Sequence, residues 1–227
     1  MTGQISKALL HRDDPAKEPL VGNIKVTRQD WINVAMDVLI SEGAEEVKVK
    51  PIGERLGVSR SSFYWYFKSR QDLLDCLLEY WQKVNTEAIV GMASAPAPTI
   101  TAAVCNVFRC LVNPELFNTQ LDLTIRDWAR RSGKVRRLLD QSDQACLRAL
   151  TAMFQRYDYP ALEAETRARI LYFMQIGYNS SELGEPMQAR LRYTPNYLLG
   201  FTGREAQAEE IEEFRRYAAT ITGVEGP

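Results

Sequence analysis

The chain has 227 residues, of which 45% are hydrophobic and 25% are charged, and its formal net charge is −1. Such a composition is typical of a water-soluble globular protein and excludes a collagenous or low-complexity chain. No apolar run approaches the ~20 residues that a membrane-spanning helix needs, and the N-terminus has no hydrophobic signal-peptide core. We therefore expect a cytoplasmic protein that does not associate with membranes.

The cysteines and the histidine limit the chemistry that we expect. The four cysteines show no C-x-x-C spacing, and the one histidine, His11, lies close to the N-terminus. A zinc site built from cysteine and histidine is therefore not expected. The sequence also has no glycine-rich phosphate loop and no histidine in its folded part, so it predicts neither a cofactor nor an enzyme.

Residues 1–23 mix both charges with prolines, and we expect them to form a flexible N-terminal arm. The first predicted helix follows this arm. Thr27 and Asp30 have the spacing of a capping box, with Asp in place of the usual Glu or Gln. Apolar residues then recur at helical spacing from Trp31 onwards, and Gly43 ends the pattern.

Residues 47–74 carry the strongest functional signal in the chain. Pro51 suits the first turn of a helix, and Gly57 suits a reversal of the chain. Ser59 can cap the next helix, which we predict over residues 60–66. Two short helices joined by such a turn are typical of the helix-turn-helix, whose second helix enters the major groove of DNA through its N-terminal end.

The polar side chains of this segment fit the same function. Residues 48–70 hold six basic residues and one acidic residue, in a chain that is close to neutral. A local excess of this kind is expected where one face meets a polyanion. Arginine can donate to guanine, and hydroxyl and basic side chains can hold phosphates. The predicted DNA-binding residues are Lys48, Lys50, Arg60, Ser61, Ser62, Tyr64, Tyr66, Lys68 and Arg70.

From Thr27 to about Leu78 the chain resembles the DNA-binding domain of TetR-family transcriptional regulators. Three stretches carry the similarity: TRQDWINVAMDVLISEG, IGERLGVS and FYWYFKSRQDLL. Three positions depart from the residues that are common in the family. Lys48 stands in place of Thr, Gly53 in place of Ala, and Arg70 in place of Lys. These departures leave the prediction of DNA binding intact but make the operator sequence harder to anticipate.

We therefore predict an all-α protein with two domains. The N-terminal three-helix DNA-binding domain, with its helix-turn-helix, is placed at residues 24–70 and is linked to a larger helical ligand-binding and dimerisation domain at residues 71–227. Residues 182–203 contain Gly and Pro at several positions and are expected to form a broken segment. The other helices of this domain are expected at about 71–92, 101–112, 116–131, 135–157, 161–181 and 205–222.

The resemblance implies that the second domain binds a small-molecule effector. Its aromatic and methionine side chains can enclose an apolar cavity with a few polar anchors, and a filled core is the alternative. Arg126 is one candidate anchor. The candidate ligand-binding residues are Phe108, Phe117, Asp127, Trp128, Phe154, Met174, Gln175 and Tyr178.

Two apolar stripes are candidates for a surface that pairs two subunits. Their residues are Ile170 and Met174 in one helix, and Ile211, Phe214, Ala218 and Ile221 in the last helix. The resemblance implies a homodimer, and a twofold dimer requires a near-palindromic operator. Packing within one chain is the alternative explanation of both stripes.

Together these inferences predict a sequence-specific transcriptional regulator that binds double-stranded operator DNA. By default, the resemblance implies a repressor, which leaves its operator when a small-molecule effector binds. The alternative is a ligand-independent DNA-binding regulator whose second domain serves only dimerisation. The effector, the operator, the regulated genes, the choice between repressor and activator, and any contact of the N-terminal arm with DNA stay open at this point.

Overall fold

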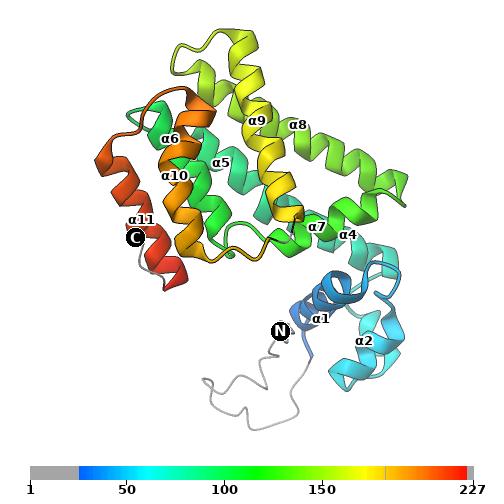
Figure 1. Cartoon of the computed structure of the whole chain (residues 1–227). Coiled ribbons are helices and arrows are strands. Elements are labelled where there is room, and N and C mark those ends of the chain that lie inside the picture. The colour runs from blue at the N-terminus through cyan, green and yellow to red at the C-terminus, as the bar shows by residue number, and fades with distance from the viewer. Residues whose placement is uncertain (1–25, 182, 224–227) are drawn as a thin grey trace. The chain divides into compact units, whose positions relative to one another are not determined.

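The computed structural model describes residues 26–181 and 183–223, so the N-terminal arm predicted over residues 1–23 lies outside it. Throughout the described residues the regular elements are helices, and there is no strand (Figure 1). The all-α fold that the sequence predicts is therefore confirmed. The chain divides into two compact units, one ending at Tyr80 and the other beginning at Trp81.

Helix α1 (Arg28–Glu42) opens the first unit with the predicted capping box. The Thr27 Oγ1 atom accepts a hydrogen bond from the Asp30 backbone N–H at 3.2 Å, and the Asp30 carboxylate accepts one from the Thr27 N–H at 2.8 Å. Two N–H groups that the helix itself leaves unpaired are thereby satisfied. The helix ends at Gly43, whose φ of 92° is one that glycine adopts without strain.

Helices α2 (Val49–Leu56) and α3 (Arg60–Phe63) form the helix-turn-helix. Gly57 between them is left-handed, with φ 68° and ψ 30°. Helix α3 is shorter than the predicted residues 60–66, because the backbone leaves the helix after Phe63 and turns. This turn places the ring of Phe67 5.1 Å from that of Phe63, and both side chains are buried.

The core of the first unit centres on Trp31, which is completely buried. The rings of Trp31 and Phe63 pack in a T-shaped arrangement, with their centroids 5.2 Å apart. A Cβ atom at Gly53 would lie 3.3 Å from the Trp31 ring and 3.2 Å from the Val58 carbonyl oxygen, closer than side chains normally pack. The missing side chain at position 53 therefore allows α2 to approach Trp31 closely, which explains this departure from the common family residue.

Most of helix α4 (Arg70–Trp81) belongs to the first unit. The Arg28 guanidinium of α1 donates to the Cys76 sulfur of α4 at 2.9 Å. Contacts of this kind place the division between the units after Tyr80, whereas the sequence predicted it at residue 70.

The helical backbone runs on from α4 through a π-helical turn, η2 (Gln82–Glu87), into α5 (Ala88–Ser94). Four buried residues, Trp81, Asn85, Ile89 and Ala93, follow one another at a constant spacing of four. An α-helix has 3.6 residues per turn, so such a spacing drifts around its surface. The wider π turn offsets this drift and keeps all four side chains on one side.

The second unit contains six further helices (Figure 1), among which α8 packs against α5, α7 and α9, and α6 packs against α5, α10 and α11. Its core contains aromatic, aliphatic and cysteine side chains from most of these helices. The helices are α6 (Ile100–Val112), α7 (Thr119–Ala129), α8 (Gly133–Gln155), α9 (Ala161–Ser180), α10 (Met187–Thr202) and α11 (Ala208–Thr222). None of the helices described is both long and apolar enough to cross a lipid bilayer.

Helix α10 corrects one prediction. The sequence predicted a broken segment over residues 182–203, but most of this segment is a single helix with Pro195 inside it. The reason is burial: Leu191, Leu198 and Phe201 lie on one face of the helix and are almost completely covered by the core. This apolar contact outweighs the backbone hydrogen bond that proline cannot form.

The cysteine thiols lead to a testable prediction. Burial raises the pKa of Cys105, Cys110 and Cys146 to about 12, whereas Cys76 is only partly covered. We expect Ellman's reagent at pH 8 to modify Cys76 first and the other three only on unfolding, because the thiolate is the reactive form. Rapid reaction of all four thiols in the native protein would contradict this.

The same pKa values set the pH dependence of stability. The buried thiols are neutral in the folded protein up to about pH 12, but unfolding returns their pKa to the ordinary value of 9.0. Unfolding is therefore coupled to loss of protons above pH 9, and the free energy of unfolding should fall between pH 9 and 12. Urea denaturation across this range measures the effect.

Candidate functional site

The first unit carries a surface hollow whose charged side chains are all basic. Its residues come from the start of α2, from α3 and the turn after it, and from the approach to α4. The lining consists of Lys48, Val49, Lys50, Arg60, Tyr64, Lys68, Ser69 and Arg70. Six of the nine predicted DNA-binding residues are therefore neighbours in space, and Ser61, Ser62 and Tyr66 lie outside this lining.

The side chains at the N-terminal end of α3 are exposed. The Arg60 guanidinium lies over the Tyr64 ring at 5.9 Å and donates to its hydroxyl at 3.1 Å. Tyr64 is 51% exposed, and Trp65 beside it, which the sequence analysis did not single out, is 85% exposed. An exposed tryptophan in this turn offers an N–H donor and a flat apolar face to a partner.

Two lysines of the hollow are held by weak surface pairs. The Lys48 ammonium lies 2.9 Å from the Glu46 carboxylate, and that of Lys50 lies 3.8 Å from Glu54. All four side chains are about half exposed or more. Pairs of this kind contribute about 0–1 kcal/mol, so a phosphate can replace the carboxylate at small cost.

Tyr66 and Arg70 make hydrogen bonds within the first unit. The Tyr66 hydroxyl donates to the Val26 carbonyl oxygen at 2.7 Å. The Arg70 Nε atom donates to the Val47 carbonyl at 2.6 Å, and its Nη2 atom donates to the Ala44 carbonyl. These donors are thus used within the protein, and both side chains help to hold the first unit together.

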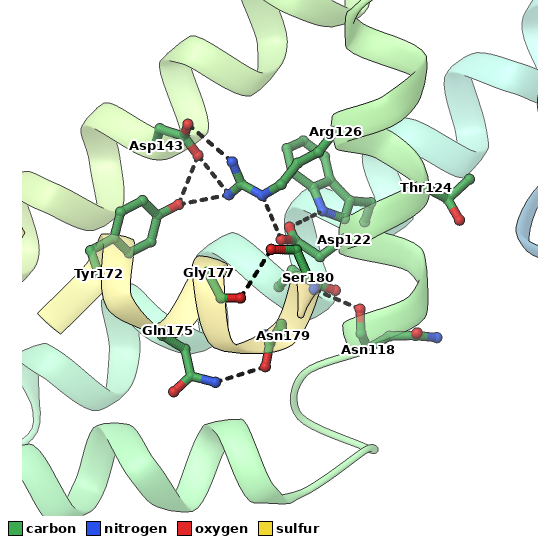
Figure 2. A network of polar contacts seen from close by, with 12 residues as sticks. Asn118, Asp122, Thr124, Arg126, Asp143, Tyr172, Gln175, Gly177, Asn179 and Ser180 are labelled. Carbon is green, nitrogen blue, oxygen red and sulfur yellow. Dashed lines mark hydrogen bonds and ion pairs between the residues drawn. The ribbon is translucent and has the colours of Figure 1, made fainter. Parts of the chain in front are cut away.

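The second unit contains a pocket with a buried polar network on one wall (Figure 2). The Arg126 Nε atom donates to the Asp122 carboxylate at 2.7 Å, and its Nη2 atom donates to that of Asp143 at 2.9 Å. Trp81 donates to Asp122 at 3.0 Å, and the Tyr172 hydroxyl donates to Asp143 at 2.7 Å. Side chains from four helices, α4, α7, α8 and α9, therefore meet in one network.

The pKa shifts in this network show which protonation states it holds. Burial lowers the pKa of Arg126, but the neighbouring Asp122 and Asp143 more than offset this, so the pKa is raised and the guanidinium stays charged. Burial, together with Cys146 and Asp143, raises the pKa of Tyr172. The phenol therefore stays protonated and remains a donor to the carboxylate.

The rest of this pocket is mainly apolar. Its apolar and neutral side chains come from η2, α5, α6, α8 and α9 and from the segment before α7. A neighbouring pocket lies between α6, α9, α10 and α11 and shares Leu111 and Gln175 with the first. In that second pocket, the Arg190 guanidinium lies 5.1 Å from the centre of the Tyr178 ring.

The predicted ligand-binding residues divide between these two pockets and the rest of the unit. Phe117 and Gln175 line the first pocket, and the second is lined by Phe108, Met174, Gln175 and Tyr178. The other three predicted residues, Asp127, Trp128 and Phe154, line neither pocket.

The positions of Asp127 and Phe154 outside both pockets have a plain physical reason. Asp127 follows Arg126 by one residue and therefore points to another side of α7, where it pairs with Arg131 at the surface. Phe154 is completely buried and packs against the ring of Tyr159 at 5.4 Å. The sequence did not point to Asp122 or Asp143 as partners of Arg126. Asp122 lies four residues before Arg126 on the same helix, a spacing that could have indicated the pair, whereas Asp143 belongs to another helix.

The predicted pairing residues also divide. Phe214 and Ala218 are buried within the chain, where Phe214 packs against Phe108 at 5.8 Å. Within this single chain they therefore do not form an exposed stripe. Ile170 is 50% exposed and Ile221 is 37% exposed. Met174 and Ile211 are partly buried.

Part of the first unit is similar to known proteins. Residues 32–77 match the model of the N-terminal domain of "Bacterial regulatory proteins, tetR family". Over 61 residues the chain is 36% identical to the tetracycline repressor protein class C of Escherichia coli. This alignment covers 27% of this chain and 28% of the relative. Over 54 residues it is 32% identical to the uncharacterized HTH-type transcriptional regulator TtgW of Pseudomonas putida. This alignment covers 24% of this chain and 40% of the relative.

Solved structures extend the likeness of fold to the second unit. Mycobacterium smegmatis AmtR superposes with a TM-score of 0.55 at 19% identity, covering 91% of this chain and 99% of that one. Salmonella enterica GusR has the same TM-score at 14% identity, and the superposition covers 87% of this chain and 95% of GusR. The chain thus shares the two-part helical fold of these proteins along most of its length, while its sequence matches to the two relatives above span 61 and 54 residues.

Proposed function

We propose that this chain is a cytoplasmic, sequence-specific, DNA-binding transcriptional regulator, because residues 32–77 match the model of the tetR family of bacterial regulatory proteins. The observation that carries the proposal is the hollow beside α3, where Lys48, Lys50, Arg60 and Lys68 converge without an acidic residue in the lining. A helix N-terminus flanked by basic side chains fits the major groove and the phosphates on either side of it.

In the proposed complex, Arg60 and Ser61 at the start of α3 face the base edges. The guanidinium of Arg60 suits the two acceptors of guanine. Lys48, Lys50 and Lys68 neutralise phosphates, and this part of the affinity falls as salt rises because bound counterions are released. Tyr64 contributes its ring and hydroxyl beside Arg60.

The first test is selection from random duplex DNA by the purified protein at low and physiological salt, with Tyr64→Ala alongside. We expect the wild-type protein to enrich a near-palindromic sequence and the variant to lose it while keeping its melting temperature within a few degrees. If refolded, ligand-free protein enriches no sequence at either salt concentration, the proposed function is wrong.

Two substitutions then separate base contacts from phosphate contacts. Arg60→Ala should weaken binding to the selected duplex by about 1–3 kcal/mol and relax the preference at one base pair. Lys50→Gln should weaken binding to all duplexes alike and reduce the slope of log K against log salt by about 1. Anisotropy titrations over a salt series measure both effects, and the exposed Lys83→Gln of the second unit is the control.

The second unit is proposed to bind a small-molecule effector that releases the operator, which makes the protein a repressor. Two adjacent pockets with mixed apolar and polar linings support this role over one of dimerisation alone. By reciprocity, the effector and the operator weaken each other's binding. The exposed Ile170 and Phe173 on α9 support a homodimer, because apolar side chains of this size cluster at subunit interfaces.

A further inference from the structure

The pocket beside Arg126 contains two buried polar atoms without a hydrogen-bond partner. These are the Asn85 Oδ1 atom and the Ser142 Oγ atom, on residues that are 2% and 4% exposed. Both residues line the pocket. Leaving a buried polar atom unpaired costs free energy, and native proteins seldom do so without a water or ligand to fill the gap.

The free atom of Asn85 must be its oxygen. The Asn85 Nδ2 atom donates to the Asn118 carbonyl at 3.0 Å, and a carbonyl can only accept. The Asn118 carbonyl thus fixes the orientation of the Asn85 amide, and the unpaired Oδ1 atom is a hydrogen-bond acceptor. Asn85 also lies in the π-helical turn η2, a distortion that occurs often at functional sites. The pocket therefore requires a partner that donates hydrogen bonds.

The charges around the pocket are unequal. Among the described residues that line it, the charged ones are Asp122 and Arg126, and Asp143 stands behind them as the second carboxylate of the network. Two carboxylates face one guanidinium, so the network carries a formal charge of −1. Arg126 already directs Nε and both Nη atoms to protein acceptors. An anionic ligand would find no cation free to receive it.

The remaining wall is mainly apolar and therefore favours a ligand with an apolar body. It includes aliphatic side chains of α5, α6, α8 and α9 and the ring of Phe117. An alkyl or aryl group buried there gains about 25 cal/mol for each Å² removed from water. The polar end of the same molecule must then lie against the acceptors.

We propose that the effector of this pocket is a small apolar molecule with a protonated amino group, whose N–H groups donate to the Asn85 and Ser142 oxygens beside the anionic Arg126 network. This inference rests on the proposed role of the second unit as an effector-binding unit. It goes beyond that role by naming the chemical class of the ligand.

The test uses three probes of equal chain length: hexylamine, 1-hexanol and hexanoate, which are cationic, neutral and anionic at pH 7. Binding to the full chain is measured by isothermal titration calorimetry and by the rise in melting temperature. Hexylamine should bind most tightly and hexanoate least. Preferential binding of 1-hexanol or hexanoate overturns the proposed class, and failure of hexylamine to bind overturns the proposal altogether.

Ser142→Ala is the decisive variant, because it deletes an oxygen that bonds nothing in the protein. The variant should fold with the same or slightly greater stability. Its dissociation constant for hexylamine should rise about 5–10-fold, as expected for one lost hydrogen bond. Ser180→Ala is the matched control: its hydroxyl bonds the Gly177 carbonyl at 3.0 Å outside the pocket lining. Equal effects of the two substitutions would refute the assignment.

The calorimetry does not involve DNA, so it fails or succeeds independently of operator binding. Selection from random duplexes on the same preparation tests the proposed function. Enrichment of an operator together with no response to hexylamine would leave the regulator in place and remove the ammonium ligand. Binding of hexylamine without any enriched sequence would support the ammonium ligand and remove the proposed DNA-binding function.

Discussion

Replacing Arg126 with glutamine is expected to lower the free energy of unfolding by about 3–5 kcal/mol, the usual cost of removing one partner from a buried ion pair. The side chains of Asp122 and Asp143 are 8% and 19% exposed, so water cannot replace the lost guanidinium well. Urea denaturation measures the change.

The exposed pair Arg131–Asp127 on the same helix is the matched control. Its side chains are 66% and 59% exposed, and Arg131→Gln should cost less than about 1 kcal/mol. Adding Asp122→Asn and Asp143→Asn to Arg126→Gln should restore part of the stability, because the unpaired charges are then gone. A loss for Arg126→Gln no larger than that of the control would show that the network is well hydrated.

The second large effect is expected at Arg70. Arg70→Gln leaves the carbonyl groups of Ala44 and Val47 without their charged donor, and we expect a loss of about 3 kcal/mol. Arg70→Lys should not restore the stability, because an ammonium lacks the planar fork that reaches two carbonyls at once. Thermal and urea unfolding of the three proteins give the comparison.

DNA titrations distinguish this structural role from the phosphate contact that the sequence predicted. With a structural role, Arg70→Gln leaves the slope of log K against log salt unchanged under conditions where the variant is folded. With a phosphate contact, the slope falls by about 1. Lys68→Gln, an exposed neighbour in the same hollow, is the control and should change the slope but not the stability.

The helix-turn-helix could be predicted because its signals are local. The capping pair Thr27 and Asp30 and the glycine at position 57 act within a few residues of their own place in the chain, and Phe63 stacks on Phe67 four residues away. Propensity and spacing are sufficient for such features. Even there, the partners of Arg70 were not visible, because they lie across the fold in the segment between α1 and α2.

The second unit was predicted less well because its organisation is non-local. Arg126 was recognised as a candidate anchor, but its partners Asp143 and Tyr172 belong to other helices, and no sequence spacing connects them. Helix α10 was missed because Gly and Pro were taken as breaks, whereas tertiary burial of one face decides the outcome. Local propensity is a weak prior where packing contributes most of the free energy.

The π-helical turn η2 makes the pocket depend on the number of residues as well as on their identity. Each residue of a helix advances the chain by about 100° around the axis. Deleting one residue between Trp81 and Asn85 would leave a regular α-helix in which these two side chains stand three positions apart, about 60° out of line around the axis. Either the tryptophan would leave Asp122 or the amide would leave the cavity. Related chains that conserve every wall residue but lack this one extra position should therefore not share the ligand.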